Sequence, residues 1–323
     1  MKITLKNKQP KAMKKIILYI IFLIAVNIAS AQQTPVTESY FLDKYSLAPS
    51  YAGNHNSQSL QIGYRSDWTG IDGGPKTTRL SYNDLFTFMK NAGYGGKIIF
   101  DNAGIFSQLY VLASYSYNVA LTDEHHLIFG LSMGGYKNRL NLQDYYNDPG
   151  YNYDPVLVNR DINSKLKFMS EFSALWKWQG AEAGVSFTNI TINNASYKDA
   201  VNLKYKPLAN FQFFGSYLWS VADNVDVEPL VIIRGGKYIR SQFEVASQVV
   251  YMQRFHGSLM YRDPGIIGAG AALSLDKGIQ IGYNFNFATN VTMNAFNNHE
   301  ISLGLKIFEF FNSKKRAAEE TKD

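Results

Sequence analysis

Short segments in which every second residue is apolar recur along most of this chain of 323 residues. Residues 127–133, 181–187 and 301–307 are clear examples. An alternation with period two indicates β-strands that have one apolar face. The opposite faces carry small residues and also charged ones, such as Glu182 and Lys306. An unpaired charge inside a packed sandwich core is unfavourable, whereas a charge in the wet lumen of a barrel is not.

The number of such segments points to a closed barrel. We count about fourteen strands, and single-chain bacterial barrels have an even number of strands. A closed barrel also leaves no unpaired strand edge in lipid. We therefore predict an all-β fold, a transmembrane antiparallel β-barrel of the outer-membrane type with about 14 strands. The predicted strands are 58–66, 76–84, 94–101, 107–119, 125–137, 164–179, 181–190, 208–220, 225–235, 239–252, 253–262, 267–275, 278–288 and 299–309.

The composition fits this fold better than it fits the rival one. Charged residues make up 18% of the chain and aromatic residues 15%, whereas a typical soluble domain has about 25% charged residues. The mean hydropathy is only −0.19, as expected when apolar lipid-facing residues alternate with polar lumen residues. A secreted β-sandwich, or a tandem of sandwiches, would also explain the alternation. It explains the scarcity of charge and the long strand series less well.

The first 31 residues read as an export signal. An apolar run of eleven residues, 16–26, follows a lysine-rich stretch and precedes Ala29-Ser30-Ala31. A membrane-spanning helix needs about 20 apolar residues. This order of segments is typical of a secretory signal peptide, so we predict cleavage after Ala31 and a mature chain that begins at Gln32. The alternative is an uncleaved anchor helix.

The net positive charge of the chain lies in the predicted signal peptide. Six lysines among the first fifteen residues account for the formal net charge of +6. The rest of the chain is formally neutral, which disfavours a nucleic-acid-binding protein. The chain has no cysteine, which excludes disulfides, thiolate chemistry and a lipoprotein anchor.

The lengths of the connections between predicted strands suggest an orientation. If the mature N-terminus is periplasmic, the long connections 67–75, 138–163 and 191–207 face outward, while the other connections are mostly short turns. Long outer loops and short periplasmic turns are the outer-membrane pattern. The connection 84–93 is an exception, and its apolar residues suggest a short interfacial helix. We expect four segments: a signal peptide (1–31), an N-terminal periplasmic segment (32–57), the barrel (58–311) and a charged C-terminal tail (312–323).

A search for catalytic and metal sites finds no convincing motif. The five histidines have no spacing of the H-E-x-x-H kind, and no G-x-S-x-G nucleophile elbow occurs. We therefore expect no enzyme, no catalytic residues, no bound metal and no cofactor. The loop 144–154 is rich in Asp, Asn and Tyr. It suggests Ca²⁺ binding or contact with a protein partner, although an ordinary polar loop explains it as well.

Several short motifs occur in a familiar order. The chain contains Ala-Pro-Ser-Tyr-Ala-Gly at 48–53 and an Arg-Ser-Asp-Trp-Thr-Gly block at 65–70, which continues to Gly-Gly-Pro-Lys-Thr at 73–77. Between about residues 41 and 307, these and later motifs resemble the PorP/SprF family of outer-membrane proteins, in which Gln is usual where Asp67 stands. The residues that carry the resemblance, and that we expect to contact a partner or to structure the loops, are Tyr51, Ala52, Gly53, Arg65, Trp68, Gly70, Gly73, Pro75, Thr77, Glu228, Pro229, Arg262, Tyr283, His299 and Glu300.

The resemblance implies a function that the residue pattern alone does not give. It implies a barrel in the outer membrane of a Gram-negative cell that is linked to the type IX secretion system and to gliding motility. Such a barrel supports the export or surface attachment of a secreted, adhesin-like protein. The implied partners are that surface protein, with its C-terminal secretion domain, other proteins of the type IX machinery, and outer-membrane lipid. The alternatives are a passive porin or solute transporter and, less well supported, an outer-membrane hydrolase.

Overall fold

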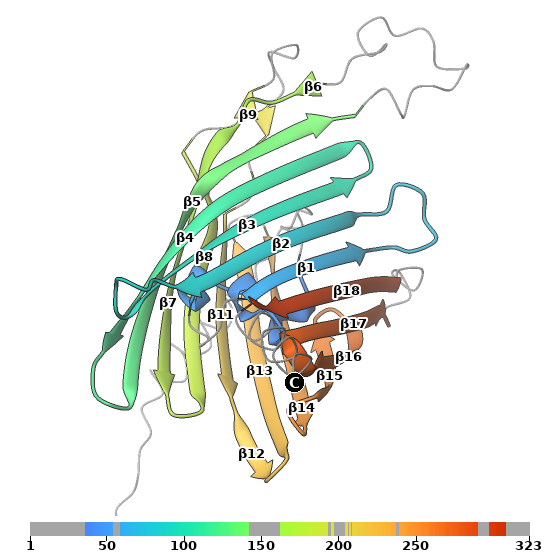
Figure 1. Cartoon of the computed structure of the whole chain (residues 1–323). Coiled ribbons are helices and arrows are strands. Elements are labelled where there is room, and N and C mark those ends of the chain that lie inside the picture. The colour runs from blue at the N-terminus through green and yellow to red at the C-terminus, as the bar shows by residue number, and fades with distance from the viewer. Residues whose placement is uncertain are drawn as a thin grey trace, which may run out of the picture.

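Fourteen long strands form one antiparallel sheet that closes on itself into a barrel (Figure 1). The computed structural model describes residues 36–53, 59–141, 162–192, 195–196, 204–205, 207, 209–236, 239–289 and 297–307. The first and last strands, β1 and β18, pair directly. The long strands are β1 (Ser59–Ser66), β2 (Lys76–Leu85), β3 (Ala92–Ala103), β4 (Phe106–Ala120), β5 (His125–Leu140), β7 (Lys167–Trp178), β8 (Ala181–Thr191), β11 (Asn210–Tyr217), β13 (Val225–Gly236), β14 (Ile239–Tyr251), β15 (Phe255–Arg262), β16 (Ile266–Leu275), β17 (Ile279–Ala288) and β18 (Asn297–Lys306).

The fold predicted from the sequence is confirmed, since each predicted strand overlaps one of these long strands. Four short strands complete the sheet pairing. They are β6 (Ile162–Asn163), which pairs with β5, the two-stranded ladder of β9 (Ala195–Ser196) and β10 (Lys204–Tyr205), and β12 (Trp219–Ala222), which continues the line of β11 along β13. No helix in the described ranges is long and apolar enough to cross a membrane.

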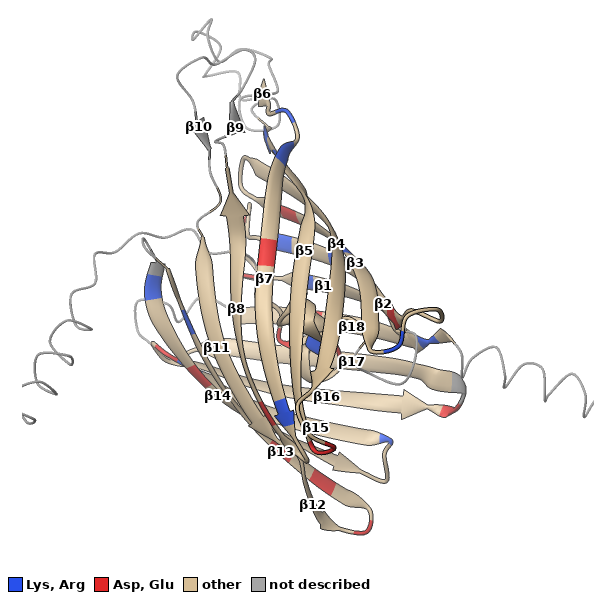
Figure 2. Ribbon diagram, turned by 90° about the vertical axis from the view of Figure 1, so that its left-hand side faces the viewer, with Lys and Arg blue, Asp and Glu red and all other residues tan. Residues whose placement is uncertain are grey.

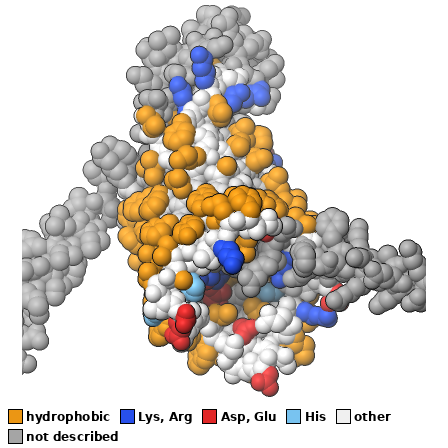
Figure 3. Space-filling model, turned by 60° about the vertical axis from the view of Figure 1, so that its left-hand side comes forward, with side chains coloured by type: hydrophobic (Ala, Val, Ile, Leu, Met, Phe, Trp, Pro, Cys, Tyr) orange, Lys and Arg blue, Asp and Glu red, His pale blue; other side chains and the backbone are white. Residues whose placement is uncertain are grey.

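The two faces of the sheet differ as the alternation predicts. On β14, Phe243 and Val245 are exposed on the outer wall, whereas Glu244 and Ala246 between and beside them are buried in the lumen. Figure 3 shows the outward hydrophobic side chains as a broad band across the wall, and Figure 2 shows few charged residues along the strands. An apolar outer band is the surface that lipid requires.

The lumen is filled by the segment in front of β1. Residues 36–53, which we call the plug, contain three short 3₁₀ helices: η1 (Ser39–Phe41), η2 (Lys44–Ser46) and η3 (Pro49–Tyr51). The plug is seen inside the barrel in Figure 1. Tyr40, Tyr45 and Tyr51 are each at most 2% exposed and belong to the hydrophobic core of the protein.

The plug corrects the expectation of a periplasmic segment over 32–57. Residues 36–53 lie in the lumen because their tyrosines are buried there and their polar groups bond to the wall. The connection 84–93 also differs from its expectation. Its residues 86–91 form bends and a turn between β2 and β3 rather than a helix. The expected signal peptide with its Ala31–Gln32 cleavage site, the 144–154 loop and the 312–323 tail lie outside the described residues.

Candidate functional site

The plug runs along the barrel from one end to the other. Glu38 bonds to Arg65, next to the end of β1 that leads into the long 67–75 connection. Fifteen residues later, the Gly53 N–H donates to Asn83 Oδ1 (3.1 Å). Asn83 is near the end of β2 that lies away from the 67–75 connection. The long connections mark the outer end of such barrels. The chain therefore enters the described structure in the outer half of the lumen and leaves it at the periplasmic end.

A chain of buried ion pairs holds the start of the plug. Glu38 accepts hydrogen bonds from Arg65 Nη1 (2.7 Å) and Arg262 Nη2 (2.8 Å). Arg262 Nε donates to Glu244 (2.6 Å), which also pairs with Arg234. Glu38 and Glu244 are 6% and 0% exposed. Removing one member of a buried ion pair leaves an uncompensated charge, so this chain fixes the plug to β1, β13, β14 and β15.

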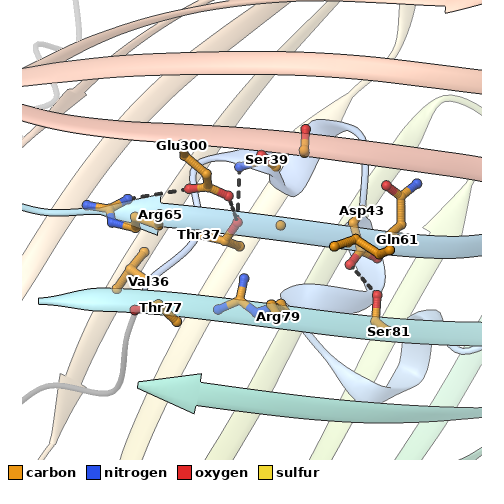
Figure 4. Close-up of a pocket in the computed structure, with 13 residues that line it drawn as sticks. Val36, Thr37, Ser39, Asp43, Gln61, Arg65, Thr77, Arg79, Ser81 and Glu300 are labelled. Atoms are coloured by element: carbon orange, nitrogen blue, oxygen red, sulfur yellow. Dashed lines mark hydrogen bonds and ion pairs between the residues drawn. The ribbon is translucent and has the colours of Figure 1, made fainter. Parts of the chain in front are cut away.

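Glu300 holds the same end of the plug from β18 (Figure 4). Its carboxylate accepts the Thr37 hydroxyl and the Glu38 N–H, the latter at 2.7 Å. Arg65 Nη1 lies 3.5 Å from Glu300 Oε2, the oxygen that also accepts the Glu38 N–H. Figure 4 shows Thr37, Arg65 and Glu300 at the lining of a small cavity between the plug and β1, β2 and β18. The volume of this cavity is about 30 Å³. The pair of strands that closes the barrel, β1 and β18, therefore also binds the plug.

Lys44 anchors the middle of the plug to β8 and β13. Its ammonium lies 2.6 Å from Glu228 Oε1 and 3.0 Å from Glu182 Oε2. Glu182 also accepts the Tyr51 hydroxyl (2.8 Å) and pairs with Lys177 (2.7 Å). Two carboxylates therefore share one plug cation, and the same cluster holds the last plug tyrosine.

Small wall residues seat the rest of the plug. Ser173 Oγ accepts the Ser50 N–H (2.8 Å), and the Ser116 hydroxyl donates to the Ala52 carbonyl (2.6 Å). Gly130 of β5 faces η3, and a Cβ there would lie within 2.6 Å of Ser50 Cα. Only a glycine lets the two backbones approach so closely. Further wall contacts of the plug are Tyr45 with Ser114, Asp43 with Ser81, and Leu47 with Gln212.

The first outer loop, residues 67–75, has a defined backbone path. The Asp67 N–H donates to the Pro75 carbonyl (2.8 Å), and the Gly104 N–H donates to the Gly73 carbonyl (2.9 Å). Gly70 and Gly73 have φ angles of 96° and 79°, and Trp68 also adopts a left-handed φ of 56°. A left-handed backbone is unusual for a bulky residue and persists only where the surroundings impose it.

This loop is joined to the plug through Arg65. Arg65 Nε donates to Asp67 Oδ1 (2.7 Å), while its other nitrogen binds Glu38. Burial raises the pKa of Asp67 above its ordinary value, although Arg65 opposes the shift. The loop surrounds a hollow of about 470 Å³, and Trp68 beside it is 43% exposed. A rigid, partly apolar surface therefore lies at the outer mouth.

A second cavity lies between the plug and the outer rim. Its volume is about 110 Å³, and its lining includes Leu47 of the plug together with Lys97, Glu171 and Arg234 of the wall. Lys97 and Glu171 form an ion pair of 2.8 Å across it. Among the residues that the structure describes, no group of three or more His, Cys, Asp or Glu side chains could hold a metal ion.

Most motif residues that we predicted from the sequence meet at the plug or at the outer loop. Tyr51, Ala52 and Gly53 belong to the plug, while four wall residues bind it. Thr77 instead bonds to Asp101 within the wall (2.7 Å). The wall residues are Arg65, Glu228, Arg262 and Glu300, and the loop residues are Trp68, Gly70, Gly73 and Pro75.

Besides Thr77, three motif residues do not join these sites. Pro229 is exposed on the outward face of β13. Tyr283 is also exposed on the outer wall, where its hydroxyl bonds to His299 Nδ1 (2.7 Å). The sequence analysis missed Glu38, Lys44 and Glu244, the other half of the ion pairs. A charged residue at a lumen-facing strand position, such as Glu244, was the available signal.

Comparison with known proteins identifies the family and several solved structures that share little sequence with the chain. No curated protein sequence matches the chain. Among solved structures, it is similar to the CymD monoaromatic hydrocarbon channel (10% identity, TM-score 0.49, over 86% of this chain and 93% of that one). It is also similar to a Pseudomonas aeruginosa FadL homologue (10% identity, TM-score 0.48, 85% and 95%) and to the Acinetobacter baumannii outer membrane protein Omp33 (6%, 0.47, 78% and 98%).

Structural likeness at that level supports no conclusion, and the fold assignment depends on the strand pairing itself. The family evidence is of a different kind. A family model described as the type IX secretion system membrane protein PorP/SprF matches residues 29–305, which is most of the chain. The matched range includes the plug, the first outer loop and nearly all of the last strand. The chain belongs to the PorP/SprF family of type IX secretion system membrane proteins.

Proposed function

We propose that this barrel is a non-enzymatic accessory of the type IX secretion system that supports the export or surface attachment of a secreted, adhesin-like protein. Its family makes it a membrane component of that system. The one observation that carries the finer proposal is the plug, which bonds to Glu182 on β8 and to Glu300 on β18, on opposite sides of the lumen. A barrel closed in this way serves as a platform for a partner rather than as its conduit.

The outer mouth is the surface that suits such a partner. It combines the rigid 67–75 loop, the exposed Trp68 side chain and a hollow beside them. Exposed tryptophans on rigid supports are frequent anchors of protein interfaces. Because Arg65 bonds to both this loop and the plug, the filled lumen supports the loop from beneath. The periplasmic rim would remain available to the other proteins of the machinery.

The experiment that tests this role is quantitative proteomics of the cell surface and of the medium, with and without the gene. Loss of one large secreted protein would identify a dedicated partner, and loss of all type IX cargo would indicate a component of the core machinery. An unchanged set of surface and secreted proteins would contradict the proposal. Complementation with the double variant Trp68→Ala/Ile71→Ser tests the outer mouth, and wild-type levels of the folded variant barrel are its control.

The second candidate function, a passive porin, makes the opposite prediction for purified protein. A plug held by buried ion pairs predicts no steady current when the full chain is inserted into a planar bilayer. Steady open currents would favour the porin. This measurement is independent of the proteomics and therefore separates the two functions.

A further inference from the structure

The loop between β2 and β3 presents apolar side chains at the periplasmic end of the barrel. Phe88, at its centre, is 78% exposed, and its neighbours Leu85 and Met89 are 41% and 39% exposed. Phe88 is more exposed than any other large hydrophobic side chain in the described part of the chain. Single exposed apolar residues are ordinary, but a contiguous group marks a surface that meets lipid or a partner.

The loop is continuous with the lipid-facing wall. The ring of Phe86 lies 4.7 Å from that of Tyr94 on β3 and 6.1 Å from that of Tyr115 on β4. Both tyrosines occupy outward positions, and Tyr115 is 40% exposed. The ring of Phe88 lies 5.0 Å from that of Phe86. The loop therefore folds along the outside of the barrel, and its aromatic rings extend the lipid-facing band beyond the ends of the strands.

Hydrogen bonds hold the loop in this position. The Phe86 N–H donates to the Ala92 carbonyl (3.0 Å), which closes the base of the loop. The Asn118 N–H donates to the Asn91 carbonyl (2.8 Å), which ties the loop to β4. Asn91 adopts a left-handed φ of 65°, so the chain turns sharply before β3 begins. The apolar side chains are thus presented by a fixed backbone.

Charged and polar groups mark where this surface meets the lipid headgroups. The hydroxyls of Tyr82 and Tyr94 donate to Asp84 at 3.5 and 3.4 Å on the same outward face. A carboxylate on the outer wall belongs at headgroup level, because the acyl region cannot solvate it. Lys90, next to Met89, is exposed. A lysine beside exposed apolar side chains suits a lipid phosphate.

We propose that residues 85–91 form an anchor for the periplasmic leaflet of the outer membrane. Phe88 and Met89 insert at the boundary between acyl chains and headgroups, and Lys90 pairs with a phospholipid phosphate. The occupant is phospholipid rather than protein, because the loop continues the wall that already contacts lipid and carries one cation at headgroup level. This inference concerns the opposite end of the barrel from the partner site proposed above, and either can fail without the other.

The absence of cysteine in the wild-type chain makes a direct test possible. In the full-length protein, Phe88→Cys is labelled with an environment-sensitive nitrobenzoxadiazole dye and reconstituted into phosphatidylethanolamine–phosphatidylglycerol vesicles, with iodide present on both sides. We expect quenching by lipids that carry a doxyl group near the headgroup and little quenching by iodide. Val231→Cys on the lipid-facing wall and Asn224→Cys in an exposed periplasmic turn are the lipid and water controls.

The outcomes separate the possibilities. A label at position 88 that is quenched by iodide as strongly as the label at 224 would overturn the proposal. A label shielded from both quenchers would show that protein covers the loop, and this would overturn it as well. Within the labelled protein, Lys90→Glu is expected to weaken quenching by the doxyl lipid and Lys90→Arg to leave it unchanged. Equal quenching in these two variants would overturn the assignment of Lys90 to a phosphate.

Discussion

Arg65 Nη1 lies 2.7 Å from Glu38 Oε1, and this ion pair joins the wall of the barrel to the plug inside it. The same guanidinium bonds to Asp67 at the start of the first outer loop. One side chain thus contacts the wall, the plug and the mouth. The interior of the barrel and its outer surface are therefore parts of a single bonded structure.

Replacing the carboxylate at the centre of this network tests its contribution. Glu38→Ala leaves Arg65 and Arg262 buried without their shared partner. Breaking a buried pair in this way destabilises a protein by about 3–5 kcal/mol. We expect a clearly lower unfolding midpoint, measured from the shift in gel mobility between folded and heat-unfolded barrel.

The matched control for Glu38→Ala is Asp263→Ala. Asp263 pairs with Arg240, and the two side chains are 39% and 55% exposed. Exposed pairs contribute only about 0–1 kcal/mol, so this variant should unfold close to the wild type. Equal midpoints for the Glu38 and Asp263 variants would contradict a stabilising role of the plug network.

A single added methyl group tests the close approach of plug and wall. Gly130→Ala places a Cβ against the backbone of η3, within 2.6 Å of Ser50 Cα, and neither backbone has room to yield. Overpacking of this kind costs about 1–3 kcal/mol. Gly257→Ala on β15 is the control, because a Cβ there meets nothing within 4 Å. The midpoint of thermal unfolding should be lower than that of the wild type in Gly130→Ala and unchanged in Gly257→Ala.

Reversing the charge of Lys44 tests whether the plug keeps the lumen closed. Lys44→Glu brings a third carboxylate against Glu182 and Glu228, where a cation now sits between them. We expect transient openings in planar-bilayer recordings, because like charges at this separation repel. Lys44→Arg keeps the charge and should stay silent. Silent recordings from both variants would show that this cluster does not hold the plug.

The buried carboxyl group of Asp67 predicts a pH dependence with a definite sign. Its pKa is raised in the folded protein, chiefly by burial, relative to an ordinary value of 3.8. The ionised form is therefore less favourable in the folded state, and this group lowers stability as the pH rises through that window. Asp67→Asn keeps an oxygen for Arg65 but cannot ionise. Its unfolding midpoint relative to wild type should be higher at pH 8 than at pH 3.

The barrel could be predicted from the sequence because its signal is local. In strands such as β8 and β18, each apolar residue and its polar neighbours lie within a few positions of one another. Short turns separate most strands, and the alternation sets which face meets lipid. The first outer loop was also indicated locally, by its glycines and Pro75.

The plug could not be predicted because its signal is spread along the whole chain. Residues 36–53 have no strand periodicity, and their partners range from Gln61 on β1 to Glu300 on β18. Burial of Tyr40, Tyr45 and Tyr51 appears only when the wall is already in place. The connection 86–91 was misjudged for a related reason. Its apolar residues suggest a helix, but bonds to Ala92 and Asn118 impose a turn.

The position of the plug at the front of the chain has a consequence for biogenesis. Thr37 and Glu38 are made early, yet their partner Glu300 arrives more than 260 residues later, on the strand that completes the cylinder. The strand that closes the barrel by pairing with β1 is therefore also the strand that completes the bonds to the start of the plug. Until β18 pairs with β1, the binding site of the plug lacks the Glu300 carboxylate that accepts Thr37 and Glu38.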